Sequence, residues 1–122
     1  MYEKKIPFDI DCGIRIAMEV IGGKWKSCII HELKDGCLRP NEIHKMFPEA
    51  NPRVINKQLK ELEMYGIIKK TIYPVLPPHS EYALTEVGKT LIPIVEKLEE
   101  WGDYFKPTMA DIMGLEIQNK YD

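Results

Sequence analysis

The sequence lacks the features that would mark it as a membrane, secreted or metal-binding protein. No apolar run approaches the roughly 18 residues of a membrane span, and the first residues show no secretory pattern. We therefore expect a cytoplasmic protein with no membrane partner. The three cysteines, Cys12, Cys28 and Cys37, form no metal-ligand spacing, and an odd number argues against a disulfide scaffold. The histidines are scattered, so we expect neither a metal nor a cofactor.

The chain also lacks convergent catalytic groups and a strong charge of one sign. No nucleophile–base–orienter set or phosphate loop is present, which argues against an enzyme. The formal net charge of −2 is small, but the charge is divided. Residues 24–70 carry ten Lys or Arg against six Asp or Glu, a balance of +4, whereas residues 85–122 carry four against eight, a balance of −4. This asymmetry permits a basic nucleic-acid face opposite an acidic one.

At 122 residues, with 44% hydrophobic and 30% charged residues, the chain is expected to form one globular domain. Its clearest segment is a helix that opens on Asn51 as N-cap, with Pro52 at the first helical position. Four apolar residues recur near the 3.6 period and predict a buried stripe: Val54, Ile55, Leu59 and Leu62. The polar residues on the remaining face are Arg53, Asn56, Lys57 and Lys60. Such a helix suits the DNA major groove, although a solvated amphipathic helix has the same pattern.

The residues that follow this helix favour the DNA-binding interpretation. Gly66 is typical of a residue just after a helix, and residues 67–73 form a strand-like run rich in β-branched side chains. Prolines in residues 74–78 require a turn, and residues 79–84 alternate again as an antiparallel partner. Helix, hairpin, helix is the order of a winged helix-turn-helix domain. The predicted fold is therefore mainly α with a small β-hairpin wing (α+β).

The other periodic segments predict further helices, with only a short strand at residues 37–39. Thr85 is expected to cap a long helix that ends before a break at Pro107, and Cys28 and Met46 are expected to face inward. The expected helices cover about residues 9–21, 24–34, 40–47, 85–104 and 109–117. We assign residues 1–122 to one domain, with about 24–84 as the DNA-binding core and about 9–21 and 85–120 as dimerisation helices.

Dimerisation is expected because the terminal apolar stripes have little left to cover within one subunit. The stripe residues are Ile14, Met18, Ile21, Leu98, Trp101, Ile112 and Met113. A two-fold dimer would place two recognition helices about one DNA turn apart, roughly 34 Å, and match an inverted-repeat operator. The alternative is that these stripes close the core of a monomer.

The chain resembles the HxlR-type transcriptional regulators, a MarR-like winged-helix family, over about residues 12–102. The resemblance implies a homodimeric DNA-binding regulator, often a repressor, with some members sensing electrophiles or oxidants through the N-terminal cysteine, here Cys12. A small-molecule or redox effector is then a further partner. The matching residues are Cys12, Ile21-Gly22-Gly23-Lys24-Trp25, Arg39-Pro40-Asn41-Glu42-Ile43, Arg53-Val54-Ile55, Leu59-Lys60-Glu61-Leu62-Glu63 with Gly66-Ile67-Ile68, Tyr73-Pro74, Pro77-Pro78, Glu81-Tyr82, Leu84-Thr85-Glu86-Val87-Gly88 and Trp101-Gly102.

Three positions depart from the family pattern. Pro40 replaces a usual aromatic residue, His79 replaces a common basic residue, and Gly13 follows Cys12 where proline is common. The last departure leaves redox sensing by Cys12 open, and the alternative is that all three cysteines are structural. Arg15, three residues after Cys12, would favour its thiolate, whereas Asp9 and Asp11 would oppose it.

Position within the groove-bound helix predicts the role of each DNA contact. We expect Arg53 and Asn56, near its beginning, to read base edges. Phosphate contacts are expected from Lys57, Lys60, Lys69 and Lys70, and Asn51, Pro52 and His79 complete the expected DNA-facing set. The alternative function is a winged-helix module for protein–protein contacts, which would not need these exposed basic residues.

Overall fold

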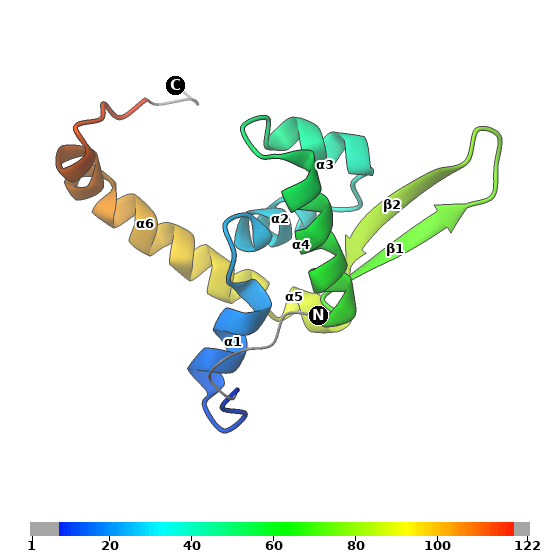
Figure 1. Ribbon diagram of the computed structural model, residues 1–122, viewed down its shortest axis with the longest axis horizontal. Coiled ribbons are helices and arrows are strands. Elements are labelled where there is room, and N and C mark those ends of the chain that lie inside the picture. Colours follow the sequence, from blue (N-terminus) through cyan, green and yellow to red (C-terminus); the bar gives the residue numbers. More distant parts are fainter. Residues whose placement is uncertain (1–7, 119–122) are drawn as a thin grey trace.

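The computed structural model describes residues 8–118 and has the predicted winged-helix architecture (Figure 1). Six helices and one antiparallel hairpin follow in the order α1 (Gly13–Ile21), α2 (Lys26–Leu33), α3 (Pro40–Met46), α4 (Pro52–Met64), β1 (Ile68–Tyr73), β2 (His79–Leu84), α5 (Glu86–Lys89) and α6 (Ile92–Met113). The hairpin and α6 extend from the middle of the molecule in opposite directions (Figure 1). The predicted short strand is reduced to one bridge, in which Leu38 pairs with Tyr82.

The core lies where α2, α3 and α4 meet the base of the hairpin. Six side chains in it are fully buried: Ile29, Ile30, Ile43, Ile55, Leu59 and Leu62. The hairpin register pairs Ile68 with Leu84 at its base and Tyr73 with His79 at its far end. Ile68 is buried because it lies at the base of the wing beside the core, whereas Ile72 and Tyr73 at the far end of β1 are exposed.

The boundaries of α4 follow the signals in the sequence. The Asn51 side chain accepts a hydrogen bond from the Arg53 N–H at 2.9 Å, as expected of an N-cap. At the other end Gly66 adopts a φ of 71°, and its N–H bonds to the Glu63 carbonyl at 2.9 Å. The Ile67 N–H reaches back to the Leu62 carbonyl, also at 2.9 Å, which completes a Schellman motif and turns the chain into β1.

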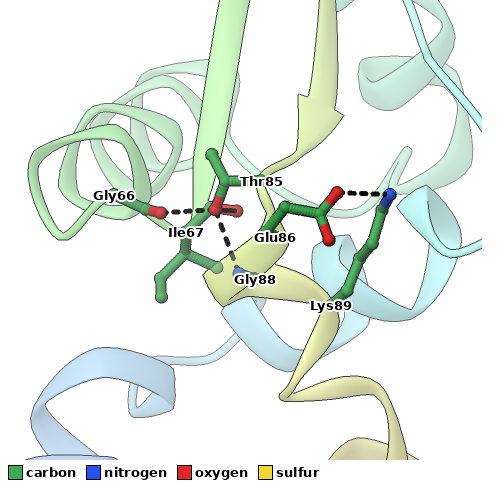
Figure 2. Close-up of polar contacts among 6 residues, drawn as sticks. All are labelled: Gly66, Ile67, Thr85, Glu86, Gly88 and Lys89. Carbon is green, nitrogen blue, oxygen red and sulfur yellow. Dashed lines mark hydrogen bonds and ion pairs between the residues drawn. The ribbon is translucent and has the colours of Figure 1, made fainter.

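Thr85 and Gly88 join the wing to the C-terminal helices (Figure 2). The Thr85 hydroxyl bonds to the carbonyl oxygens of Gly66 and Ile67, the latter at 3.1 Å, and accepts the Gly88 N–H at 3.0 Å. A Cβ at Gly88 would lie only 2.1 Å from the Ile67 carbonyl oxygen, so a side chain there would force this junction apart. The base of the wing is thus fixed to α5.

The C-terminal helices differ from the prediction. Thr85 caps the four-residue α5, not a long helix. Pro93 cannot donate to the Lys89 carbonyl, and the N–H groups of Thr90 and Leu91 bond three residues back, which ends α5 early. Pro107, predicted to break the chain, lies inside α6. Its missing hydrogen bond frees a carbonyl on an exposed part of the helix, where water can satisfy it.

The first helix begins later than predicted, at Gly13, with Cys12 as N-cap. Asp9 does not cap it, because its carboxylate accepts the Asp11 N–H at 3.0 Å before the helix starts. The helix expected over about residues 9–21 would have placed Cys12 in its first turn, but Cys12 precedes that turn, and its side chain makes no capping hydrogen bond.

Three residues predicted to be buried are exposed. Val54 is 40% exposed, and the buried stripe of α4 contains Gln58 in its place. Met46 is also exposed, because Ile43 alone of α3 reaches the core. Cys28 is exposed since the buried side of α2 is formed by other residues: Lys26, Ile29, Ile30 and Leu33.

Candidate nucleic-acid interface

The α3 and α4 helices form the helix-turn-helix pair, and a polar contact ties them together. Arg39, before α3, donates its N–H to Glu42 Oε1 at 2.8 Å and so fixes the start of that helix. The short connection at residues 47–50 then turns the chain into α4, and His44 Nε2 lies 3.0 Å from Asn56 Oδ1. Asn56, predicted to read bases, is thus already oriented by α3.

The outer side of α4 carries the predicted DNA-facing set. The residues of this set on α4 are exposed: Arg53, Asn56, Lys57 and Lys60. Asn51 and Pro52 are exposed at its beginning, although the Asn51 side-chain oxygen is used as a cap. On the inner side Gln58 Oε1 accepts the Trp25 N–H at 3.0 Å, which fixes the rotation of α4 about its axis. The helix therefore presents cations on one face and packs the other.

The wing offers a more divided surface. Lys69 and Lys70 are both exposed, but successive residues of a strand point to opposite faces, so they cannot lie on one surface. The Lys70 ammonium lies 5.7 Å from the centroid of the Tyr82 ring. His79 stacks on Tyr73 with ring centroids 4.9 Å apart, and its Nε2 lies 3.9 Å from the Glu81 carboxylate. The imidazole is therefore held at the root of the turn.

The three cysteines lie apart and are free. Cys12 is half-buried and Cys37 is exposed. Although Cys28 as a whole residue is exposed, partial burial of its thiol raises the pKa of that thiol above its ordinary value, and the carboxylates of Glu32 and Glu99 raise it further. Among residues 8–118 no three His, Cys, Asp or Glu side chains gather closely enough to hold a metal ion. No helix in the same residues has both the length and the apolar character needed to cross a bilayer.

The terminal apolar residues are exposed, with one exception. The exposed ones among the predicted interface residues are Ile14, Met18, Leu98, Trp101, Ile112 and Met113. Ile21 is only 5% exposed and belongs to the core of the chain, so it offers no surface to a second subunit. It lies at the end of α1, where the helix turns toward α2, and the tertiary packing there closes over it.

Comparison with known proteins agrees with this geometry. Residues 20–110 match the family model of the HxlR-like helix-turn-helix. An HTH-type transcriptional regulator of Methanothermobacter thermautotrophicus is 46% identical over 94 residues, which cover 77% of this chain and 72% of the relative.

Two solved structures share the fold. The redox regulator HypR in its oxidised form is 42% identical with a TM-score of 0.73, covering 76% of this chain and 96% of that one. Diamide-treated YodB from Bacillus subtilis is 32% identical with a TM-score of 0.66, covering 80% and 97%. The predicted resemblance and winged-helix fold are confirmed. The chain belongs to the HxlR-like helix-turn-helix family.

Proposed function

We propose that this chain, a DNA-binding transcriptional regulator, acts as a homodimeric repressor on an inverted-repeat operator in the cytoplasm. The observation that carries the proposal is the exposed basic face of α4, presented by a helix-turn-helix. A protein-contact module would not need that face, and the relatives are named transcriptional regulators, not enzymes.

Within this interface we assign base reading to Arg53 and Asn56. An arginine can donate two hydrogen bonds to guanine, whereas an asparagine can donate one to adenine N7 and accept one from the adenine amino group. Phosphate contacts are assigned to four lysines: Lys57, Lys60, Lys69 and Lys70. Since the two wing lysines face opposite surfaces, one of them is expected to contribute much less. His79 is oriented by Tyr73 and Glu81, and its ring N–H is available in the expected DNA-facing set.

The homodimer is proposed from the exposed terminal side chains, of which Trp101 (61% exposed) and Ile112 (71% exposed) are examples. Burying such residues contributes about 25 cal/mol per Å² of apolar area, offset by the cost of association. An interface built from α1 and α6 would also place the acidic C-terminal region away from DNA, where its charge does not oppose binding.

A redox effector is proposed from the relatives and from Cys12. HypR is described as a redox regulator, and YodB was solved after diamide treatment. Cys12 is half-buried at the beginning of α1, beside the proposed dimer interface, so its modification would alter that helix. The alternative, that the cysteines are structural, predicts no effect of oxidants on DNA binding.

The test begins with duplexes that the wild-type protein selects from a random pool. We expect a palindromic consensus, a dimer mass at micromolar concentration, and lower output from a reporter that carries the selected sequence. The absence of any enriched sequence would overturn specific DNA binding, and a monomeric mass would overturn the dimer.

A second comparison treats the wild type and Cys12→Ser with diamide. Loss of binding in the wild type alone supports sensing by Cys12. Equal loss in both proteins, or loss in neither, removes Cys12 from the mechanism.

A further inference from the structure

A partly buried polar cluster on one flank of α4 joins three helices. Lys26, the first residue of α2, has a side chain that is only 4% exposed. Its ammonium lies 3.4 Å from Glu61 Oε2 on α4 and 5.7 Å from the centroid of the Tyr65 ring, just after α4. The Tyr65 hydroxyl donates to Glu19 Oε1 on α1 at 3.3 Å. The cluster thus connects α1, α2 and the end of the recognition helix.

The connection between α1 and α2 holds α4 by a second contact. Trp25, immediately before Lys26, donates its N–H to Gln58 Oε1 at 3.0 Å. Gln58 and Glu61 are three residues apart and so lie on the same face of α4. Gly23 adopts a φ of 107°, and a Cβ there would lie 3.4 Å from Gln58 Nε2. Residues 23–26 therefore contact α4 at two successive points along one face.

The chemistry of this cluster favours orientation over stability. Burying an ammonium carries a desolvation cost that its ion pair often does no more than offset, and an apolar side chain of similar length is often as stable. The Trp25–Gln58 hydrogen bond and the Lys26–Glu61 ion pair depend on the rotation of α4 more strongly than apolar contacts do. Gln58 lies across α4 from Arg53 and Asn56, whose reach to base edges depends on the rotation of the helix.

We propose that Lys26 is a positioning residue for DNA reading, which fixes α4 against α1 and α2 through Glu61 and Tyr65. This inference rests on the proposed function and deepens it. Because α1 carries part of the proposed dimer interface, the same contacts transmit the arrangement of the two subunits to the two recognition helices.

The test compares Lys26→Met, which keeps length and removes charge, with Lys24→Met as matched control. Lys24 is exposed and lies 5.3 Å from the ring centroid of Trp25. The probes are a duplex that the wild type selects from a random pool and a duplex of random sequence. In folded Lys26→Met the affinity for the selected duplex should fall about two- to thirtyfold, while random DNA is bound as before. In Lys24→Met the ratio of the two affinities should stay within about twofold of the wild-type ratio.

Two outcomes would overturn the proposal. One is that folded Lys26→Met binds both duplexes with the wild-type affinities. The other is an equal loss on both duplexes together with a lower unfolding midpoint, which describes a purely structural residue. If Lys26→Met does not fold, Glu61→Gln decides by the same criteria, because the Glu61 side chain is 35% exposed and tolerates the change.

A failure of the proposed function is recognised separately. If the wild type selects no duplex, the DNA-reading part of the proposal fails with the proposed function, and amide hydrogen exchange of the free proteins then decides whether Lys26 fixes α4. Faster exchange in residues 58–64 of Lys26→Met, with α3 unchanged, supports the role. Unchanged exchange in α4 overturns it.

Discussion

The middle of the chain and its two ends differ in what covers their apolar side chains. All six fully buried large side chains belong to α2, α3 and α4. The structure describes every residue of α1 and α6. Ile21 is the only buried residue of α1, and Val95 is the only buried residue of α6. Residues 24–70 carry a balance of +4 and residues 85–122 one of −4. The middle therefore holds most of the core and the basic surface, whereas most of the apolar side chains of the ends are uncovered.

The largest expected effect is on the stability of the middle. Leu62→Ala removes a fully buried side chain and should lower the free energy of unfolding by about 2–5 kcal/mol. Ile112→Ala, at a position that is 71% exposed, should change it by less than about 0.5 kcal/mol in a protein dilute enough to be monomeric. Urea titrations followed by circular dichroism measure both. Equal losses would show that the ends belong to the core of the protomer.

The next effect tests what the ends do. Trp101 stacks on Phe105 with ring centroids 5.0 Å apart and planes inclined by 10°, which fixes a broad aromatic surface. Trp101→Ala should weaken self-association by about 2 kcal/mol or more, roughly thirtyfold, as expected for a buried aromatic at an interface centre. Sedimentation over a concentration series measures the change.

The matched control for Trp101 is Asp103→Ala. By helical periodicity Asp103 lies on the opposite side of α6, where it pairs with Lys106 at 3.2 Å. Its loss should leave self-association unchanged. A dimer that is weakened equally by both substitutions would place the interface elsewhere.

Local signals in the sequence were sufficient for α2, α3, α4 and the hairpin, although not for the short strand expected at residues 37–39. Asn51-Pro52 and Gly66 mark the ends of α4 because capping depends on neighbours within one turn. Thr85 was correctly predicted as an N-cap, but the predicted length of its helix was wrong. A cap specifies only the first turn of a helix, whereas the missing N–H of Pro93 lies eight residues further along the chain. The break predicted at Pro107 was also wrong, because an exposed helix tolerates the loss of one backbone hydrogen bond.

The contacts that orient the site could not be predicted from the sequence. Lys26 and Glu61 are 35 residues apart, and His44 and Asn56 are 12 apart, so no periodic pattern links them. Lys26 has the sequence signature of an ordinary surface lysine, and Gln58 that of an exposed polar residue. Only the packing of α2 against α4 buries them, which is also why Val54 was assigned to the core in place of Gln58.

A smaller effect separates base reading from charge within the middle region. Arg53→Ala should cost about 1–3 kcal/mol on a selected duplex and relax sequence preference, because a bidentate contact to a base edge is lost. Lys69→Ala, if Lys69 is the wing lysine that meets phosphate, should weaken all duplexes alike and lower the salt slope by roughly one unit. Fluorescence anisotropy at several salt concentrations distinguishes the two. Unchanged binding of both duplex types by Arg53→Ala would mean that α4 does not read the bases.

The smallest effect concerns the contact between the two regions, at a cavity of about 400 Å³ between α2 and α6 that Cys28, Leu98 and Glu99 line. Burial, then Glu32 and Glu99, raise the pKa of the Cys28 thiol, so less thiolate is present at neutral pH. Because the thiolate is the nucleophile, iodoacetamide should modify Cys28 more slowly in the folded protein than in the unfolded chain. The pH at which its rate is half-maximal should also be higher than for a free cysteine.

Charge substitutions on α6 test whether that helix stays beside Cys28 in solution. Glu99→Gln removes one of the carboxylates that oppose the thiolate and should raise the rate, more visibly near neutral pH than at high pH, where the thiol is ionised in either protein. Glu100→Gln, whose carboxylate pairs with Lys97 at 3.1 Å, is the matched control and should leave the rate unchanged. Peptide mass spectrometry of the Cys28 fragment measures each rate. If both substitutions left the rate at the wild-type value, α6 would not lie against α2, and the two regions would be less firmly joined than the buried Val95 indicates.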